Sequence, residues 1–301
     1  MQILIAGGTG FLGNALIQEL IRTDNNISVL TRYPRKHQNH QRLSYFSWDG
    51  KTLGDWLALV ESSDCVINLT GENLGNKRWR RIQKEKIIGS RVDSGNVLTH
   101  AISMVKHKPK VFIQPSGIGY YGSSVEGELN ESSPPGDDFL AQICRQWEAS
   151  SQGIEALGVR RVVIRIGVVL SRNEGALKRL LLPYYFFLGG PLGSGKQVLS
   201  WIHLSDVVQG IIKIMKYPSF NGVYNFVAPK PATNEEIGRT IARILKRPYW
   251  LPIPSIFLKI LFGEMSTLVI DGQYAIPDKL MASNYHFKFS NIDDALKEIL
   301  S

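Results

Sequence analysis

Four glycines within seven residues constrain this chain more than any other feature. The stretch GGTGFLG (residues 7–13) follows the apolar run QILIA (2–6) and precedes the amphipathic segment NALIQELIR (14–22). An ordinary turn between a strand and a helix would need one glycine at most. A turn this rich in glycine is typical of the dinucleotide-binding fingerprint G-x-G-x-x-G, because glycine lets the backbone approach a pyrophosphate closely. The N-terminus of the helix that follows then attracts the negative charge.

The fingerprint is satisfied in two overlapping registers, G-x-G-x-x-G and G-x-x-G-x-x-G. Every residue of the loop is therefore a candidate for contact with a nucleotide cofactor. The candidates are Gly7, Gly8, Thr9, Gly10, Phe11, Leu12 and Gly13.

The end of the second expected strand predicts which dinucleotide the loop binds. An acidic residue about 20 positions past the motif would bind the ribose of NAD, whereas an arginine accommodates the 2′-phosphate of NADP. The run ISVLT ends at Thr31, Arg32 follows it, and no acid stands there. A guanidinium pairs with phosphate through charge-assisted hydrogen bonds. Thr31 and Arg32 thus favour NADP over NAD; the alternative is that Arg32 is an ordinary surface arginine.

Alternation of apolar strands with helical segments predicts the fold class. Five short runs rich in β-branched residues are typical of strands buried on both faces, and amphipathic segments such as 14–22 and 91–105 separate them. Such βαβ units form a parallel sheet with helices on both faces. We predict an α/β fold, a Rossmann-type doubly wound parallel sheet with a smaller, mostly helical C-terminal portion on the substrate side. The expected strands are residues 2–6, 27–31, 65–70, 111–116 and 161–170.

The character of the sequence changes in the second half and predicts two parts. Residues 171–200 are rich in glycine and proline, with one apolar helix candidate. Further on, Thr233 is a candidate N-cap with Glu236 three residues later, and the remainder is mostly helical. We predict an NADP-binding Rossmann domain at 1–230, to whose substrate side 171–200 contribute, and a helical C-terminal module at 231–301.

The net charge of +9 has two competing explanations. It arises from 35 Lys and Arg against 26 Asp and Glu, and much of it lies in 32–42 and 76–86. Basic clusters attract nucleic acid, but no helix-turn-helix, zinc-finger or RNA-binding signature accompanies these. A solvated face, or a pocket for an anionic cofactor, is the favoured explanation.

Other sequence features indicate in which cellular compartment the protein is expected. Cys65 and Cys144 form neither a disulfide framework nor a metal-ligand pattern, which is typical of a reducing compartment. The apolar stretch 180–193 is too short and too broken by proline and glycine to span a bilayer. We expect a cytoplasmic monomer or homodimer that acts on a small molecule, without metal, nucleic-acid or membrane partners.

Several motifs resemble those of a known family. GGTGFLG, SGIGYYG (116–122) and WIHLSDVVQGI (201–211) resemble the extended and atypical short-chain dehydrogenase/reductases, the group of nucleotide-sugar epimerases. NLTGENL (68–74), KIIGSR (86–91) and DFLAQICRQWEA (138–149) are similar to the small YfcH-like "epimerase family" proteins, and the resemblance covers essentially the whole chain. It implies an NADP site to which Leu69, Thr70, Gly71, Lys86, Arg91 and Glu148 also contribute.

The same resemblance draws attention to missing catalytic residues. Such enzymes normally pair a tyrosine with a lysine four residues on, which lowers the pKa of the tyrosine. This chain has Cys144 and Glu148 at those places. A carboxylate there would raise the pKa of a neighbouring acid. The proton donor is therefore expected elsewhere: Tyr121 and Ser116 are the catalytic candidates, Tyr120 ranks after Tyr121, and a packing role for Tyr121 is an equal alternative.

Two functions remain open at this point. The first is an NADP(H)-dependent oxidoreductase or nucleotide-sugar-epimerase-like enzyme of unknown substrate. The second is a non-catalytic NADP-binding regulatory or sensor protein, because the resemblance extends to proteins connected with cell division.

Overall fold

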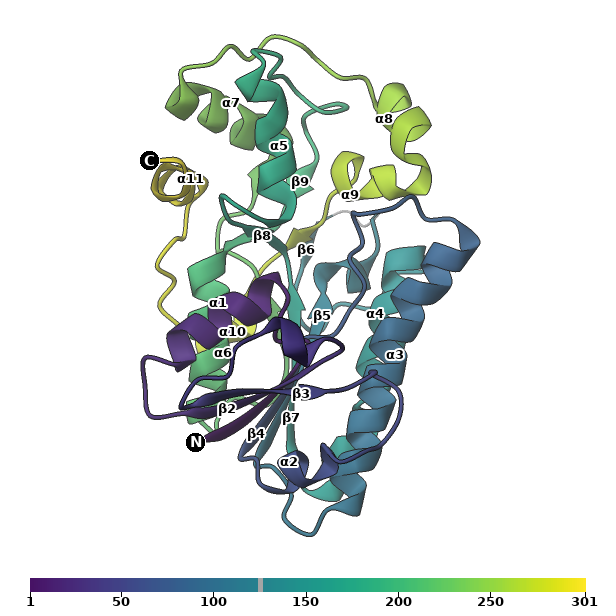
Figure 1. Ribbon diagram of the computed structural model, residues 1–301. Helices are drawn as coiled ribbons and strands as arrows, with labels where there is room; N and C mark the ends of the chain where they lie inside the picture. Colours follow the sequence, from purple (N-terminus) through teal and green to yellow (C-terminus); the bar gives the residue numbers. More distant parts are fainter. Residues whose placement is uncertain (124–126) are drawn as a thin grey trace.

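The computed structural model describes residues 1–123 and 127–301 and is built on a seven-stranded sheet (Figure 1). Every pair of neighbouring strands in it is parallel, in the order β11-β7-β5-β4-β1-β2-β3. This confirms the expected Rossmann-type α/β fold. The strands are β1 (Gln2–Ala6), β2 (Asn26–Thr31), β3 (Leu43–Ser47), β4 (Cys65–Asn68), β5 (Val111–Gly117), β7 (Arg160–Ile166) and β11 (Gly222–Phe226).

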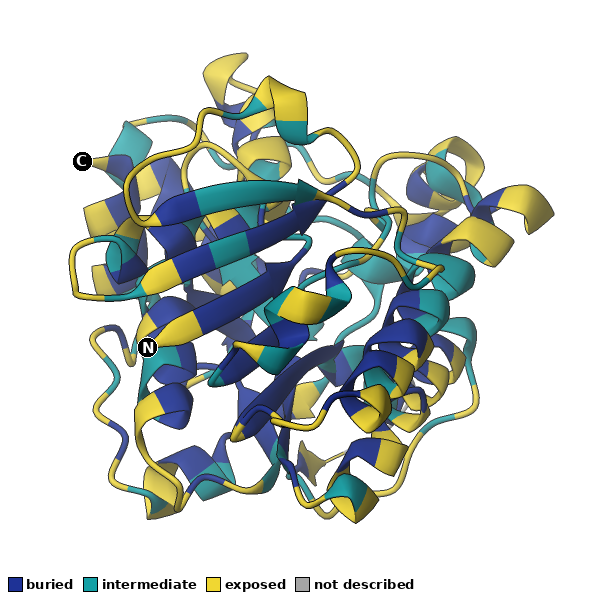
Figure 2. Cartoon of the chain, turned by 60° about the horizontal axis from the view of Figure 1, so that its bottom comes forward, coloured by how far each residue is buried: buried dark blue, intermediate teal, exposed yellow. Residues whose placement is uncertain are grey.

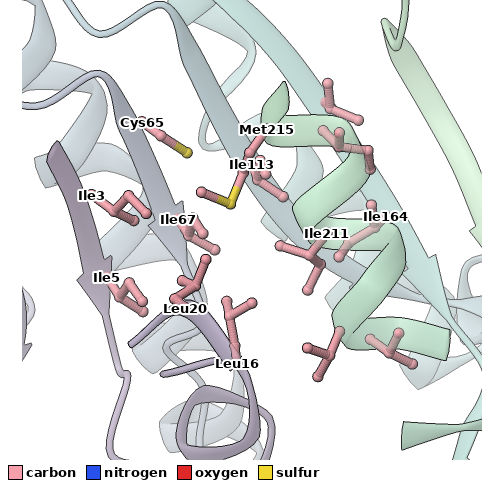
Figure 3. Packing of buried hydrophobic residues seen from close by; sticks show 14 of the residues in the cluster. Ile3, Ile5, Leu16, Leu20, Cys65, Ile67, Ile113, Ile164, Ile211 and Met215 are labelled. Carbon is pink, nitrogen blue, oxygen red and sulfur yellow. The ribbon is translucent and has the colours of Figure 1, made fainter. Parts of the chain in front are cut away.

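Helices cover both faces of the sheet because each turns one apolar stripe towards it. On one face, α1 (Phe11–Leu20) and α6 (Leu204–Lys216) pack against the isoleucines of β1, β4, β5 and β7 (Figure 3). On the other face lie α2 (Leu57–Glu61), α3 (Arg81–Met104) and α4 (Phe139–Ala149). The strands between these layers are buried along most of their length (Figure 2). Burial on both faces explains their continuous apolar sequences.

The remaining elements gather beyond the carboxyl ends of the strands and along one sheet edge (Figure 1). Three small two-stranded sheets tie distant segments together: β8 with β10, β9 with β12, and β6 with β13. The strands are β6 (Glu128–Leu129), β8 (Val168–Leu170), β9 (Val198–Leu199), β10 (Trp201–His203), β12 (Ala232–Thr233) and β13 (Tyr274–Ala275). The helices are α5 (Gly175–Tyr185), α7 (Asn234–Leu245), α8 (Ser255–Phe262), α9 (Thr267–Ile270), α10 (Asp278–Ala282) and α11 (Ile292–Leu300).

Two expectations about the strands need correction. The run 161–170 is not one strand, because the chain leaves the sheet at Gly167, where a Cβ would lie 2.2 Å from the carbonyl oxygen of Ser200. Strand β3 was not expected, because it is a half-exposed edge strand without a continuous apolar run. The N-cap at Thr233 is confirmed: its side chain and that of Glu236 form a capping box at the start of α7. Within the described residues, no helix has the length and apolar character needed to cross a membrane.

Candidate cofactor site and active site

The glycine loop lies at the point where the strand order reverses. From β1 the sheet grows in one direction through β2 and in the other through β4, and α/β folds bind ligands outside the carboxyl ends of the strands at such a point. The loop backbone is attached to both neighbours: the N–H of Gly7 donates to Leu30 O at 3.1 Å, and the N–H of Leu69 donates to Ala6 O at 2.8 Å. The ends of β1, β2 and β4 therefore form one continuous surface.

The glycines of the loop do two different things. A Cβ on Gly7 would lie 2.9 Å from the backbone of Leu69 and Thr70, and one on Gly13 would lie 2.4 Å from Gly8 O. These two glycines permit close packing of backbone against backbone. Gly10 is different, because a Cβ there would meet only Gly7 O, at 3.5 Å, and the residue is exposed. Gly10 is the N-cap of α1 and offers no side-chain acceptor, so the first helical N–H groups face open space, as anion binding requires.

Thr70 carries a second sign that the site is built for a ligand. Its hydroxyl oxygen is buried and has no hydrogen-bond partner within residues 1–123 and 127–301. A buried polar atom left unpaired is costly, so such atoms commonly mark a place where a ligand or water binds. Gly71, the next residue, is exposed and lies against the guanidinium of Arg91. The donor-rich loop, the unpaired hydroxyl and the exposed glycine together fit a dinucleotide.

Arg32 stands at the end of β2, one strand away from the glycine loop. Its side chain is exposed and forms no ion pair with any carboxylate in the part of the chain that the structure describes. Thr31 is buried, and its hydroxyl accepts a hydrogen bond from the N–H of Tyr33 at 3.4 Å. Arg32 is therefore free to bind an anion, while Thr31 shapes the turn beside it.

Lys86 and Arg91, two other residues expected at the cofactor site, have different surroundings. Arg91 is buried: its guanidinium donates to the carbonyls of Glu72 and Ile87, at 3.0 Å each, and stacks on the Trp147 ring. Burial lowers the pKa of Arg91 to about 10, so it stays charged near neutral pH. Through its hydrogen bond to Glu72 O, Arg91 holds the segment that follows Thr70 in place. Lys86 is exposed on α3, and its side chain forms no hydrogen bond or ion pair within the described residues.

Ser116, at the end of β5, belongs to a buried polar network with Glu148 of α4. The Ser116 hydroxyl donates to Glu148 Oε1 at 2.7 Å. Arg165 of β7 donates two hydrogen bonds to the same carboxylate, from Nε to Oε1 at 2.9 Å and from Nη2 to Oε2 at 3.0 Å. The side chains of Arg165 and Glu148 are only 4% and 12% exposed, respectively. Burial lowers the pKa of Arg165, but the hydrogen bonds and negative charge of Glu148 raise it more, so Arg165 stays charged.

The two tyrosines after β5 differ in accessibility. Tyr121 is fully buried, and its hydroxyl donates to Asn225 Oδ1 at 2.7 Å and accepts from Arg165 Nη1 at 3.1 Å. Burial raises the pKa of Tyr121, an effect that Arg165 partly offsets. Tyr120 is half-buried, and its ring lies over the Arg165 guanidinium, 3.3 Å from the ring centroid. Within the described residues the Tyr120 hydroxyl has no hydrogen-bond partner. The burial of Tyr121 favours a packing role for it.

Cys144 faces the same network but is not a nucleophile near neutral pH. Its side chain is buried next to Gly117. Burial and the negative charge of Glu148 raise the pKa of the thiol to about 11. Because the thiolate is the reactive form, Cys144 is chemically inert at this position.

Sequence reasoning missed Arg165 and Asn225, which complete the network. A charged residue in the middle of the apolar run RVVIRIGVVL was the available signal, because a buried arginine needs a partner. The partner itself could not be read from the sequence, since Glu148 lies on a helix and Arg165 on a strand. His203, by contrast, has the structural role that its position before α6 suggests: it caps the helix by accepting from the N–H of Ser205.

We expect Arg165→Met to destabilise the fold, because it leaves the Glu148 carboxylate buried without its cation. Breaking one side of a buried ion pair costs roughly 3–5 kcal/mol. The double variant Arg165→Met, Glu148→Leu removes both charges and should regain most of that loss. Urea unfolding of the wild type and the two variants measures the difference. Equal stability of the single and double variants would contradict the pairing.

The fold and the site are those of a dinucleotide-binding protein of the doubly wound type. A family model described as the NAD dependent epimerase/dehydratase family matches residues 3–226, and a model described as a domain of unknown function, DUF1731, matches residues 253–299. The chain belongs to the NAD-dependent epimerase/dehydratase family.

Relatives and solved structures agree with this assignment. "Epimerase family protein SSP1921" of Staphylococcus saprophyticus is 38% identical over 300 residues, covering 99% of this chain and 98% of the relative. The structure of human epimerase family protein SDR39U1 (isoform 2), solved with NADPH, is 34% identical with a TM-score of 0.89, covering 100% and 99% of the two chains. A Bacillus cereus UDP-glucuronic acid 4-epimerase variant solved with NAD has a TM-score of 0.82 over 100% and 98% of the chains. At 16% identity, this last likeness shows the fold alone.

Proposed function

We propose that this protein is an NADP(H)-dependent oxidoreductase of the short-chain type that interconverts a carbonyl and an alcohol on a small-molecule substrate. Epimerisation of a nucleotide sugar would use the same two half-reactions in sequence. The observation that carries the proposal is Arg32, an exposed guanidinium at the β2 end beside the glycine loop, which pairs with no carboxylate of the described residues. A relative that is 34% identical over the whole chain was solved with NADPH, which supports the same choice of cofactor.

Different residues of the chain would bind different parts of the cofactor. The first-turn N–H groups after Gly10 would bind the pyrophosphate, and Arg32 the 2′-phosphate. The Thr70 hydroxyl would gain the hydrogen bond that it lacks. Glu148 Oε2 accepts from a single Arg165 nitrogen, and a carboxylate oxygen has room for a second donor, such as a ribose hydroxyl.

The bound nicotinamide supplies or accepts a hydride. The chain must supply the proton that balances it on the substrate oxygen. Glu148 is held by Arg165 and Ser116, and Tyr121 is enclosed, so neither offers a free proton at the surface of the site. Tyr120 is half-buried, its ring lies over the Arg165 guanidinium, and its hydroxyl has no hydrogen-bond partner among residues 1–123 and 127–301. Tyr120 is therefore the proposed proton donor in preference to Tyr121, while the Ser116 hydroxyl, which donates its proton to Glu148, can only accept a further hydrogen bond.

We expect Arg32→Asp to weaken NADPH binding roughly ten- to a hundredfold, because one charge-assisted contact is worth about 1.5–3 kcal/mol. Titration of the wild type and the variant with NADPH and with NADH measures the preference. The neighbouring variant Arg35→Asp is the matched control for a general change of surface charge. Wild-type protein that binds NADH as tightly as NADPH would contradict the role of Arg32.

A substrate panel tests the enzymatic part of the proposal. Purified protein with NADPH is incubated with carbonyl compounds and nucleotide sugars, and nicotinamide absorbance reports net reduction. Because epimerisation consumes no cofactor, the sugars are also analysed by NMR for a change of configuration. Tight NADPH binding without any turnover would contradict the enzyme and favour the regulatory alternative instead.

A further inference from the structure

A second recess lies apart from the cofactor site, between α1, α6 and α11 (Figure 1). Its volume of about 700 Å³ is within the range of about 300–1,000 Å³ that is typical of small-molecule sites. Residues of β8, of the turn after it and of the segment before α11 complete its lining. The glycine loop 7–13, Arg32 and Tyr120 do not line it. The recess is therefore separate from the site of the proposed reaction.

The walls of this recess are joined by polar contacts between distant segments. The Asp206 carboxylate, in the first turn of α6, accepts from the N–H groups of Lys288 at 2.8 Å and of Phe289 at 3.1 Å. These bonds attach the segment before α11 to the start of α6. His203 is attached to α11 itself, because its Nε2 lies 3.1 Å from Glu298 Oε2. The fold itself thus forms the recess.

The deepest part of the recess is apolar. Apart from the His203 ring, the buried residues of its lining are Leu170 of β8, Val208 of α6 and Ile299 of α11. Small-molecule sites commonly combine such an apolar lining with a few polar groups that orient the ligand. An aliphatic group of a ligand would be taken out of water against these three side chains.

Two side chains of opposite charge line the recess without pairing with each other. Lys288 Nζ forms no hydrogen bond or ion pair within residues 1–123 and 127–301, and over the same residues the Glu298 carboxylate accepts from His203 alone. Burial lowers the pKa of His203 more than Glu298 raises it, so the ring is neutral near neutral pH and leaves the charge of Glu298 uncancelled. Glu19, the other carboxylate of the lining, pairs with Arg22 at 2.6 Å.

Other polar side chains of the lining also have unused hydrogen-bonding groups. Arg172, in the turn after β8, donates through Nη1 to Ser301 O at 3.0 Å, and its other nitrogens form no hydrogen bond to a described residue. The side-chain amides of Gln18 on α1 and Gln209 on α6 likewise form none within the described residues. The recess therefore presents charges of both signs together with neutral donors and acceptors.

We propose that this recess binds a small aliphatic zwitterion, either an amino acid or a short peptide. Its ammonium group would donate to the Glu298 carboxylate, and its carboxylate would accept from Lys288 and Arg172. Its aliphatic side chain would cover Val208 and the apolar residues beside it. A molecule with a single charge would leave either Lys288 or Glu298 unpaired, so both charges are needed.

Titration calorimetry on the full chain tests the proposal with leucine and with the tripeptide alanyl-leucyl-alanine. We expect at least one of them to bind with a Kd below about 1 mM, and the tighter of the two decides between amino acid and peptide. The tripeptide with an acetylated N-terminus and an amidated C-terminus has no terminal charges, so it should bind at least roughly tenfold more weakly. Octanoate and octylamine, which carry one charge each, should be weaker by a similar factor.

Two substitutions, Lys288→Met and Glu298→Gln, each remove one charge from the recess. Both positions are exposed, and the glutamine amide oxygen can still accept from His203, so circular dichroism should be unchanged. Each variant should weaken binding of the zwitterion roughly tenfold, because one charge-assisted contact is lost. Lys297→Met on α11 and Glu61→Gln on α2 are the matched controls, since they make the same changes outside the recess.

Failure of both zwitterions to bind at about 10 mM overturns the proposal. Equal binding of the capped tripeptide, of octanoate or of octylamine overturns it too, because charges of both signs would then not determine binding. Unchanged affinity in either recess variant, or an equal loss in the control variants, would place the ligand elsewhere and overturn it in the same way.

Discussion

Gly10→Val is expected to abolish NADPH binding in a protein that still folds. Gly10 has φ −82° and ψ 176°, an extended conformation that valine adopts readily, and a Cβ there meets only Gly7 O at 3.5 Å. The added methyl groups would instead occupy the open space in front of the α1 N-terminus, where the pyrophosphate is expected. We expect a loss of more than about a hundredfold in affinity, or at least about 2.7 kcal/mol.

Gly13→Val is the contrasting control for this experiment. A Cβ on Gly13 would lie 2.4 Å from Gly8 O, so this substitution should destabilise the fold itself. Circular dichroism with thermal unfolding, alongside an NADPH titration, distinguishes the two effects. If folded Gly10→Val protein kept its NADPH affinity, the loop would be a structural turn and the cofactor would bind elsewhere.

Tyr120→Phe is expected to lower turnover by roughly 10²–10⁴-fold, the range typical of a lost general acid. The substitution removes only a hydroxyl that makes no described contact, so folding and NADPH binding should survive. Turnover is measured with the substrate that the carbonyl and nucleotide-sugar panel identifies. The pair of tyrosines offers a matched comparison, because Tyr120 and Tyr121 are adjacent and both contact Arg165.

Tyr121→Phe should have the opposite profile. It removes the donor to Asn225 Oδ1 and the acceptor for Arg165 Nη1, so it should cost about 1–3 kcal/mol of stability while turnover is largely kept. A large loss of turnover in Tyr121→Phe with activity retained in Tyr120→Phe would reverse the assignment and restore Tyr121 as the donor. Loss in neither would direct attention to Ser116.

Local patterns explain which parts of the fold were predictable. Strands β1, β2, β4 and β5 were expected because burial on both faces leaves a continuous apolar run in the sequence. Strand β3 has no such run, since it is an edge strand with one buried residue, Leu43. Helix α3 begins at Arg81, ten residues before the segment 91–105 that suggested it. Its first turns are polar, and they are held by tertiary contacts such as the ion pair of Lys84 with Glu264.

The sequence by itself determined the class of cofactor and the sheet that carries it. A glycine loop, a strand end with Arg32 and alternating βα segments are local features, and each acts through the backbone or the residue next to it. Only the tertiary structure decided which polar groups remain free. Glu148, Arg165 and Tyr121 lie on α4, β7 and the turn after β5, and their mutual contacts remove them from the surface while leaving Tyr120 partly accessible. Burial and pairing depend on how distant elements pack together, and no pattern within a single element records that.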